Sequence, residues 1–148
     1  MIPSSSISEN RSAEAVVSDW FDAFARRDVE ALMQLASDKI VEELPGVGVI
    51  SGPEQERAFL SGLFASFPDL ETEVKRVTAG GSVVAVEWVR RGAFTGSPWQ
   101  GMPPTGKSFE TTGAAFMEVK DGQVTHVIAY SDSAQLASAL TPDSDPAA

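Results

Sequence analysis

Carboxylates, arginine and tyrosine are the side chains through which this sequence could do chemistry. The chain has no cysteine and one histidine. Disulfides, cysteine nucleophiles, thiolate metal sites and multi-histidine zinc or iron sites are therefore excluded. We accordingly expect no metal and no cofactor, and any catalysis has to rest on acid/base groups and on a cation that stabilises negative charge.

Arg90 is the cation best placed by its spacing. It shares strand parity with Val84, Val86 and Trp88, so it faces the concave side of a sheet if Trp88 does. A guanidinium there could hold an enolate, carboxylate or phenolate oxygen. Alternatively, the pair Arg90 and Arg91 marks where the strand leaves the core, with both heads in water.

His126, Tyr130 and Asp132 share one parity on the last predicted strand. At ~3.3 Å per residue, His126 and Asp132 lie about 20 Å apart and cannot form a relay. Tyr130 and Asp132 are closer, about 7 Å by the same rise, and are possible alternative acid/base groups. Asp132 with Gln135 also fits a capping box, and His126 is better explained on the convex face or in a dimer interface.

Helical spacing dominates the first half of the chain. A helix is predicted from a cap at Ser12 to about Arg27, a short one after Asp28, and one from Pro53 to before Pro68. Between the last two, residues 39–45 suggest a short strand or extended arm.

Period-two β-branched patterns then predict four strands, around residues 70–74, 84–88, 109–119 and 124–130. Helices followed by a strand meander indicate an α+β fold, a curved antiparallel sheet wrapped around three N-terminal helices. Residues 96–106 are too rich in proline and glycine for a tight turn and suggest a lid or rim.

The last hairpin decides which side chains face inward. A two-residue loop at Asp121 and Gly122 pairs Tyr130 with Gly113, whereas a three-residue loop including Lys120 pairs Ala129 with Gly113. We favour the three-residue loop, for a reason that the family resemblance supplies below.

The length of the chain limits the number of domains, and its charge limits the classes of molecule that it can bind. The 148 residues fit one domain, predicted over 12–140, with disordered tails at 1–11 and 141–148. The formal net charge of −10 and scattered basic residues argue against nucleic acid. No run is apolar enough for a membrane span, and no signal peptide is recognisable, so we expect a cytoplasmic protein with no membrane partner.

Several motifs together resemble a known family. Over about residues 13–140 the chain is similar to the SnoaL-like polyketide cyclases of the nuclear transport factor 2-like superfamily. The motifs that carry the similarity are WFDAFARRDVEALMQLASD, a GP that opens a helix, FPDL, FTG, GMPPTGK and a last strand introduced by DG. The resemblance implies a cone-shaped roll with a pocket between sheet and helices, and a homodimer through the sheet. It says little about chemistry, because this scaffold hosts aldol cyclases, isomerases, epoxide hydrolases and dehydratases.

The family's catalytic groups do not carry over. The histidine and aspartate of the aldol cyclases align with Ala115 and Ala129, and the hairpin register favoured above puts both on one face. The aspartate, arginine and aspartate of limonene epoxide hydrolases align with Trp88, Arg90 and Ala129. Glu43 aligns where the hydrolases place an asparagine that helps to hold water, which favours a pocket position and a raised pKa; alternatively it is a solvent-facing acid beside Glu42.

These observations lead to one main expectation and one alternative. The main one is a SnoaL-like enzyme that performs cofactor-independent cyclisation, isomerisation or hydration, as an isomerase or lyase would, on a hydrophobic polyketide- or terpenoid-like substrate. Glu43 is the predicted acid or base and Arg90 the anion stabiliser. The alternative is a non-catalytic ligand-binding module. The predicted pocket residues are Phe24, Phe64, Trp88, Ala115, Met117, Val127 and Ala129.

Overall fold

The computed structural model describes residues 11–143, which form four helices and six strands. The tails predicted at 1–11 and 141–148 lie largely outside this range. The helices are α2 (Ala13–Ala25), α3 (Val29–Leu35), α4 (Gly52–Ser66) and α5 (Ser133–Leu140). The strands are β1 (Ala36–Leu44), β2 (Gly48–Ser51), β3 (Glu71–Gly80), β4 (Val83–Ala93), β5 (Ser108–Lys120) and β6 (Gln123–Ser131).

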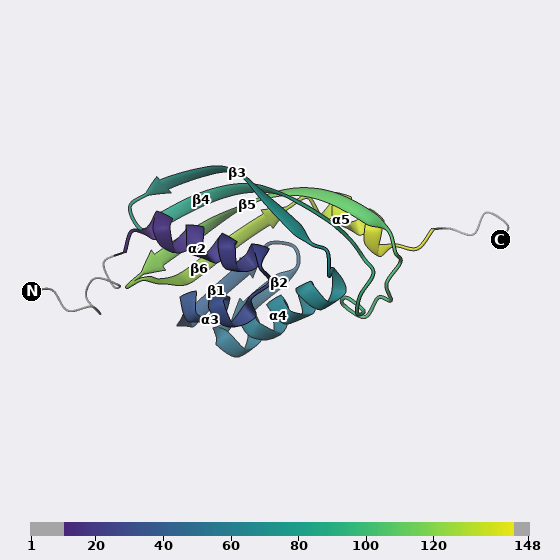
Figure 1. Cartoon of the computed structure of the whole chain (residues 1–148), viewed down its shortest axis with the longest axis horizontal. Coiled ribbons are helices and arrows are strands. Elements are labelled where there is room, and N and C mark those ends of the chain that lie inside the picture. Colours follow the sequence, from purple (N-terminus) through teal and green to yellow (C-terminus); the bar gives the residue numbers. More distant parts are fainter. Residues whose placement is uncertain (1–10, 144–148) are drawn as a thin grey trace, which may run out of the picture.

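All six strands join one curved sheet in the order β2-β1-β6-β5-β4-β3, with α2, α3 and α4 on one side (Figure 1). The α+β class is confirmed. The sheet is mixed rather than wholly antiparallel, because β1 pairs parallel to β6. The extended arm predicted at 39–45 is the second half of β1, and the sequence analysis did not identify β2.

Helix signals in the sequence act as predicted. The Ser12 hydroxyl accepts a hydrogen bond from the Ala15 amide, and the Asp28 carboxylate accepts one from the Ala31 amide. Pro53 stands in the first turn of α4, where a missing N–H costs nothing. The buried side of α2 includes Trp20 and Phe24. Burying each apolar side chain contributes about 1.5–3 kcal/mol.

The turn between β5 and β6 differs from both predicted registers. Lys120 pairs with Gln123, so the loop is the two-residue turn Asp121–Gly122, and both turn residues have positive φ, as a type I′ turn requires. One residue further along, an irregularity shifts the register, so that Ala115 pairs with Ala129. The favoured three-residue loop is therefore wrong, but the bulge restores the same parity, which places Ala115 and Ala129 on the same face.

Gly113 holds the central tryptophan in place. It pairs with Trp88 on β4, and a Cβ at position 113 would lie 2.7 Å from Cζ2 of that indole. The indole therefore lies over the backbone of β5, where only glycine leaves room. Trp88 is 2% exposed, which makes it a fixed part of the concave surface.

Candidate functional site

A cavity of about 330 Å³ lies between the concave face of the sheet and the helices. Six aromatic residues dominate its wall: Trp20, Phe21, Phe24, Phe59, Trp88 and Trp99. Helix α5 closes one side through Leu136, Ala137 and Leu140, and the loop predicted as a lid or rim contributes Trp99 and Gln100. Val47, which is 63% exposed, lines the cavity where it meets solvent. Such a largely apolar space suits a hydrophobic small molecule.

The predicted pocket residues lie mostly in this wall. The cavity is lined by Phe24, Trp88, Ala115, Met117, Val127 and Ala129. Phe64 is the exception: it lies behind Phe24, with ring centroids 5.0 Å apart in an edge-to-face contact. Ala115 and Ala129 are cross-strand neighbours, and their small side chains both line the cavity.

The carboxylates in the cavity are Glu42 and Glu56, and neither was predicted. Glu43 lies on the opposite face of β1, where its Oε2 is 2.6 Å from His126 Nε2 on β6. Its expected position in the pocket is thus corrected to the outer face, meaning the face of the sheet away from the helices. Successive strand residues point to opposite faces, so a shift of one residue exchanges Glu43 for Glu42.

Glu56 projects from the second turn of α4 and is fully buried. In the described part of the chain, no group outside the pair donates a hydrogen bond to either carboxyl oxygen of Glu56 or to Oε2 of Glu42. The carboxyl proton of one acid can bridge to the other. Burial raises the pKa of Glu56 to about 9, with further contributions from the charge of Glu42 and from their mutual hydrogen bond. At neutral pH Glu56 therefore holds its proton.

Glu42, the other carboxyl of this pair, is affected by both of its neighbours. Burial raises its pKa, while the hydrogen bond from Glu56 and the charge of Arg90 act in the opposite direction. The cavity thus contains a protonated carboxyl, Glu56, beside a second carboxyl whose ionised form is favoured by the hydrogen bond from Glu56 and by the charge of Arg90.

Arg90 supplies the positive charge. Its guanidinium carbon lies 4.5 Å from the ring centroids of both Phe24 and Trp88, and its Nε donates to the Thr72 hydroxyl at 3.2 Å. Burial lowers its pKa to about 10, so it stays protonated at neutral pH. Within residues 11–143 no ion pair of 4.0 Å or less joins Arg90 to Glu42, although both line the cavity. Most of the guanidinium's donors are thus left for a bound molecule.

The alternative acid/base candidates lie outside the cavity. Tyr130 is on the outer face and is 49% exposed. The Asp132 carboxylate caps α5 by accepting from the amides of Ala134 and Gln135. His126 pairs with Glu43 on the outer face. Across the described range, no group of three or more histidine, aspartate and glutamate side chains is arranged to hold a metal ion.

The sequence contained signals for both missed acids. Glu42 shares strand parity with Ile40, which is 1% exposed, so an inward Ile40 places Glu42 inward. Glu56 stands four residues before Leu60 and eight before Phe64, on the apolar side of α4. An acid on that helical stripe is buried with it.

The fold and site can now be compared with known proteins. The model of the SnoaL-like domain family matches residues 17–127, and the chain belongs to this family. Among curated proteins no match was found. No helix in the described range is long and apolar enough to span a membrane.

Solved structures share the whole fold. A protein from Jannaschia sp. CCS1 put forward as a SnoaL-like polyketide cyclase is 25% identical, with a TM-score of 0.81 over 89% of this chain and 93% of that one. IdmH from Streptomyces antibioticus, put forward as a polyketide cyclase, is 27% identical, with a TM-score of 0.74 over 88% and 99%. An NTF2-like protein from Burkholderia xenovorans LB400 is 24% identical, with a TM-score of 0.71 over 87% and 95%. The cone-shaped NTF2-like fold is thereby confirmed.

Proposed function

We propose that this protein is an enzyme that carries out cofactor-independent acid/base chemistry on a hydrophobic, polyketide- or terpenoid-like substrate. The observation that carries the proposal is the buried pair Glu42 and Glu56 in an aromatic cavity that also contains Arg90. With Glu42 as the ionised base of the proposed mechanism, Glu56 protonated and Arg90 charged, the three groups have no net charge together. Burying a charged ligand beside them would leave its charge uncompensated, so the substrate is neutral.

The common chemical step is a proton transfer. Glu42 takes a proton from a carbon next to a substrate carbonyl. The electron pair of that C–H bond forms a C=C bond, and the π pair of the carbonyl moves to its oxygen. Arg90 stabilises the resulting enolate oxygen. The enolate carbon can attack a second carbonyl carbon, which forms a C–C bond and closes a ring. Where the enolate is conjugated with a C=C bond, it can instead take a proton at the far carbon of the conjugated system, which shifts the double bond and isomerises the substrate. In the hydration of an epoxide, Glu42 would instead take a proton from water while the water oxygen bonds to an epoxide carbon; the C–O bond at that carbon breaks, and its oxygen is protonated by Glu56. In each case the proton returns from the Glu42–Glu56 pair, so the pair is regenerated.

Glutamine substitutions at neighbouring positions test this role. Glu42→Gln removes the base and should lower kcat by at least the ~10²-fold typical of general acid/base groups. Glu43→Gln removes a carboxylate one residue away on the opposite face, and should leave kcat within about twofold. Turnover of ketone, polyketone and epoxide substrates is the measurement. An unchanged rate in Glu42→Gln, or equal losses in both variants, would contradict the proposed base.

The second candidate is a non-catalytic ligand-binding module. Ala115 and Ala129 favour it, because they widen the cavity at the positions where the family resemblance expects proton-moving groups. Under this alternative the wild type binds neutral aromatic molecules but turns none of them over, and Glu42→Gln changes affinity alone.

We further propose a homodimer formed through the outer face of the sheet. Phe116 on β5 and Tyr130 on β6 are each 49% exposed there, and a self-complementary apolar surface suits a two-fold dimer. The cytoplasmic location stays a prediction from the sequence.

A further inference from the structure

A second hollow lies beside the cavity, between α2 and β3. Its volume is about 260 Å³, and we call it the α2–β3 groove. Val17, Val74 and Val77 form its apolar part. Val74 and Val77 are 39% and 42% exposed, so this apolar surface is open to solvent. Glu14 and Asp22 also line the groove, and none of its lining residues is basic.

Phe21 separates the groove from the cavity. It is the one described residue that lines both hollows. Its ring centroid lies 6.3 Å from that of Trp88, which is fixed over Gly113. Phe21 is itself only half-buried. The boundary between the two hollows therefore includes this aromatic side chain.

We propose that Phe21 is a specificity-determining residue that limits how far a ligand in the cavity can extend toward β3. With a smaller side chain at this position, the α2–β3 groove becomes a subsite for the end of a longer ligand. Its valines suit an alkyl or aryl substituent, and Glu14 and Asp22 favour a neutral or cationic end over an anionic one. The inference shares with the proposed function the premise that the cavity binds the ligand, but it does not depend on turnover.

Binding of a series of 4-alkylphenols tests the proposal. The phenol is neutral, its hydroxyl can contact Glu42 or Arg90, and the alkyl chain grows by one carbon at a time. All three tryptophans of the chain line the cavity, so their fluorescence reports occupancy, and calorimetry gives an independent Kd. Each newly buried methylene should lower the Kd about fourfold, from ~0.8 kcal/mol per CH₂.

In the wild type this decrease should stop at a particular chain length. In Phe21→Ala it should continue for at least two more carbons, so that the longest phenols bind more than tenfold tighter than to the wild type. Phe21→Leu, a milder change, should shift the limit in the same direction and guards against misfolding of the alanine variant. The double variant Phe21→Ala, Val77→Trp fills the groove from its exposed side and should restore the wild-type limit.

Phe59→Ala is the matched control, because Phe59 lines the cavity but not the groove. The proposal is overturned if the wild type and folded Phe21 variants share one chain-length limit, if Phe59→Ala moves it equally, or if no protein binds the phenols. The last outcome would also remove the cavity as a ligand site. A shift in Phe21→Ala combined with normal turnover in Glu42→Gln would instead refute only the acid/base proposal.

Discussion

At the scale of single residues, the buried acid Glu56 is the feature that most needs a functional explanation. A fully buried carboxyl without a donor from the described residues costs stability that an apolar residue in its place would not. Such costs are typical of sites whose perturbed groups serve chemistry. The neighbouring Glu42 can accept a hydrogen bond from the Glu56 proton. Together the two acids supply the proton-transferring groups that the apolar wall of the cavity lacks.

This buried acid makes stability depend on pH. Folding raises the pKa of Glu56 from 4.5 to about 9, so between these values the folded state binds more protons than the unfolded state. The free energy of unfolding then falls as pH rises, by at most ~1.4 kcal/mol per pH unit for this group. Glu56→Gln removes the titration, so its stability relative to the wild type should increase from pH 5 to pH 8.

Urea unfolding at each pH measures the difference between Glu56→Gln and the wild type. Glu43→Gln is the control, since its exposed carboxylate is paired with His126 rather than buried. A stability difference for Glu56→Gln that stays constant across this range would show that Glu56 is ionised in the folded protein.

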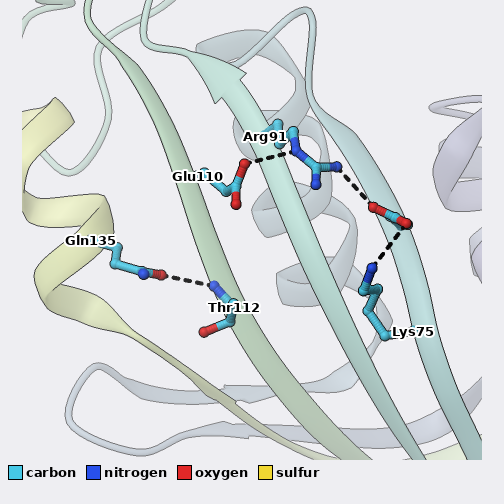
Figure 2. Close-up of polar contacts among 6 residues, drawn as sticks. Lys75, Arg91, Glu110, Thr112 and Gln135 are labelled. Carbon is cyan, nitrogen blue, oxygen red and sulfur yellow. Dashed lines mark hydrogen bonds and ion pairs between the residues drawn. The ribbon is translucent and has the colours of Figure 1, made fainter.

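At the scale of elements, the segment that begins α5 continues the hydrogen bonding of β5 where β6 ends, and α5 itself closes one side of the cavity. Strand β6 ends at Ser131, opposite Gly113, so the preceding residue of β5, Thr112, has no partner on β6. The Asp132 amide donates to the Thr112 carbonyl, and the Gln135 side chain accepts from the Thr112 amide (Figure 2). The capping box expected from Asp132 and Gln135 is therefore only half formed: the aspartate caps α5, while the glutamine continues the ladder of β5.

Substitutions at Asp132 separate a helix cap from a catalytic acid. Asp132→Ala removes two hydrogen bonds to α5 and should cost about 1 kcal/mol of stability. Asp132→Asn keeps the cap and should leave both stability and turnover near wild type, because the carboxylate lies outside the cavity. Thermal unfolding and kcat provide the two measurements. A large loss of kcat in a stable Asp132→Asn protein would return this residue to the list of acid/base groups.

At the scale of the whole molecule, the two faces of the sheet differ in character. The concave face carries the cavity. The outer face has charged and apolar regions, and its charged part is a chain of contacts from Glu110 through Arg91 and Glu73 to Lys75 (Figure 2). These exposed pairs each contribute little to stability. The apolar part contains Phe116 and Tyr130, so association would bury hydrophobic surface and leave the ion pairs near its edge.

The proposed dimer is tested by placing a charge in this apolar part. Phe116→Glu puts an acid on each copy near the two-fold axis, which should shift the protein from dimer to monomer. Val77→Glu changes a similarly exposed residue in the α2–β3 groove and should leave the mass unchanged. Sedimentation equilibrium at several concentrations gives the masses. A monomeric wild type, or a dimer that Phe116→Glu leaves intact, would contradict an interface on this face.

The sequence by itself determined the elements of this protein. Helix caps such as Ser12 and Asp28, and Pro53 in a first helical turn, act on residues close to them in the chain. The helical and strand periods of the apolar residues are local in the same way, so local patterns suffice to predict the α+β class. For Arg90 the sequence supplied the parity with Trp88, and the inward position of Trp88 in the structure then set its face. Strand β2 was missed because four residues between turns carry too little pattern.

Only the tertiary structure decided which acids meet in the cavity. Glu42 and Glu43 are identical in type and adjacent, and their faces depend on how β1 pairs with β6, a strand more than 80 residues away, with a register shift between Ala36 and Val41. The bulge that follows the Asp121–Gly122 turn likewise depends on cross-strand pairing. Glu56 comes from a helix and meets Glu42 through packing alone. Such long-range contacts set the site, because a one-residue change of register reverses the face of every side chain.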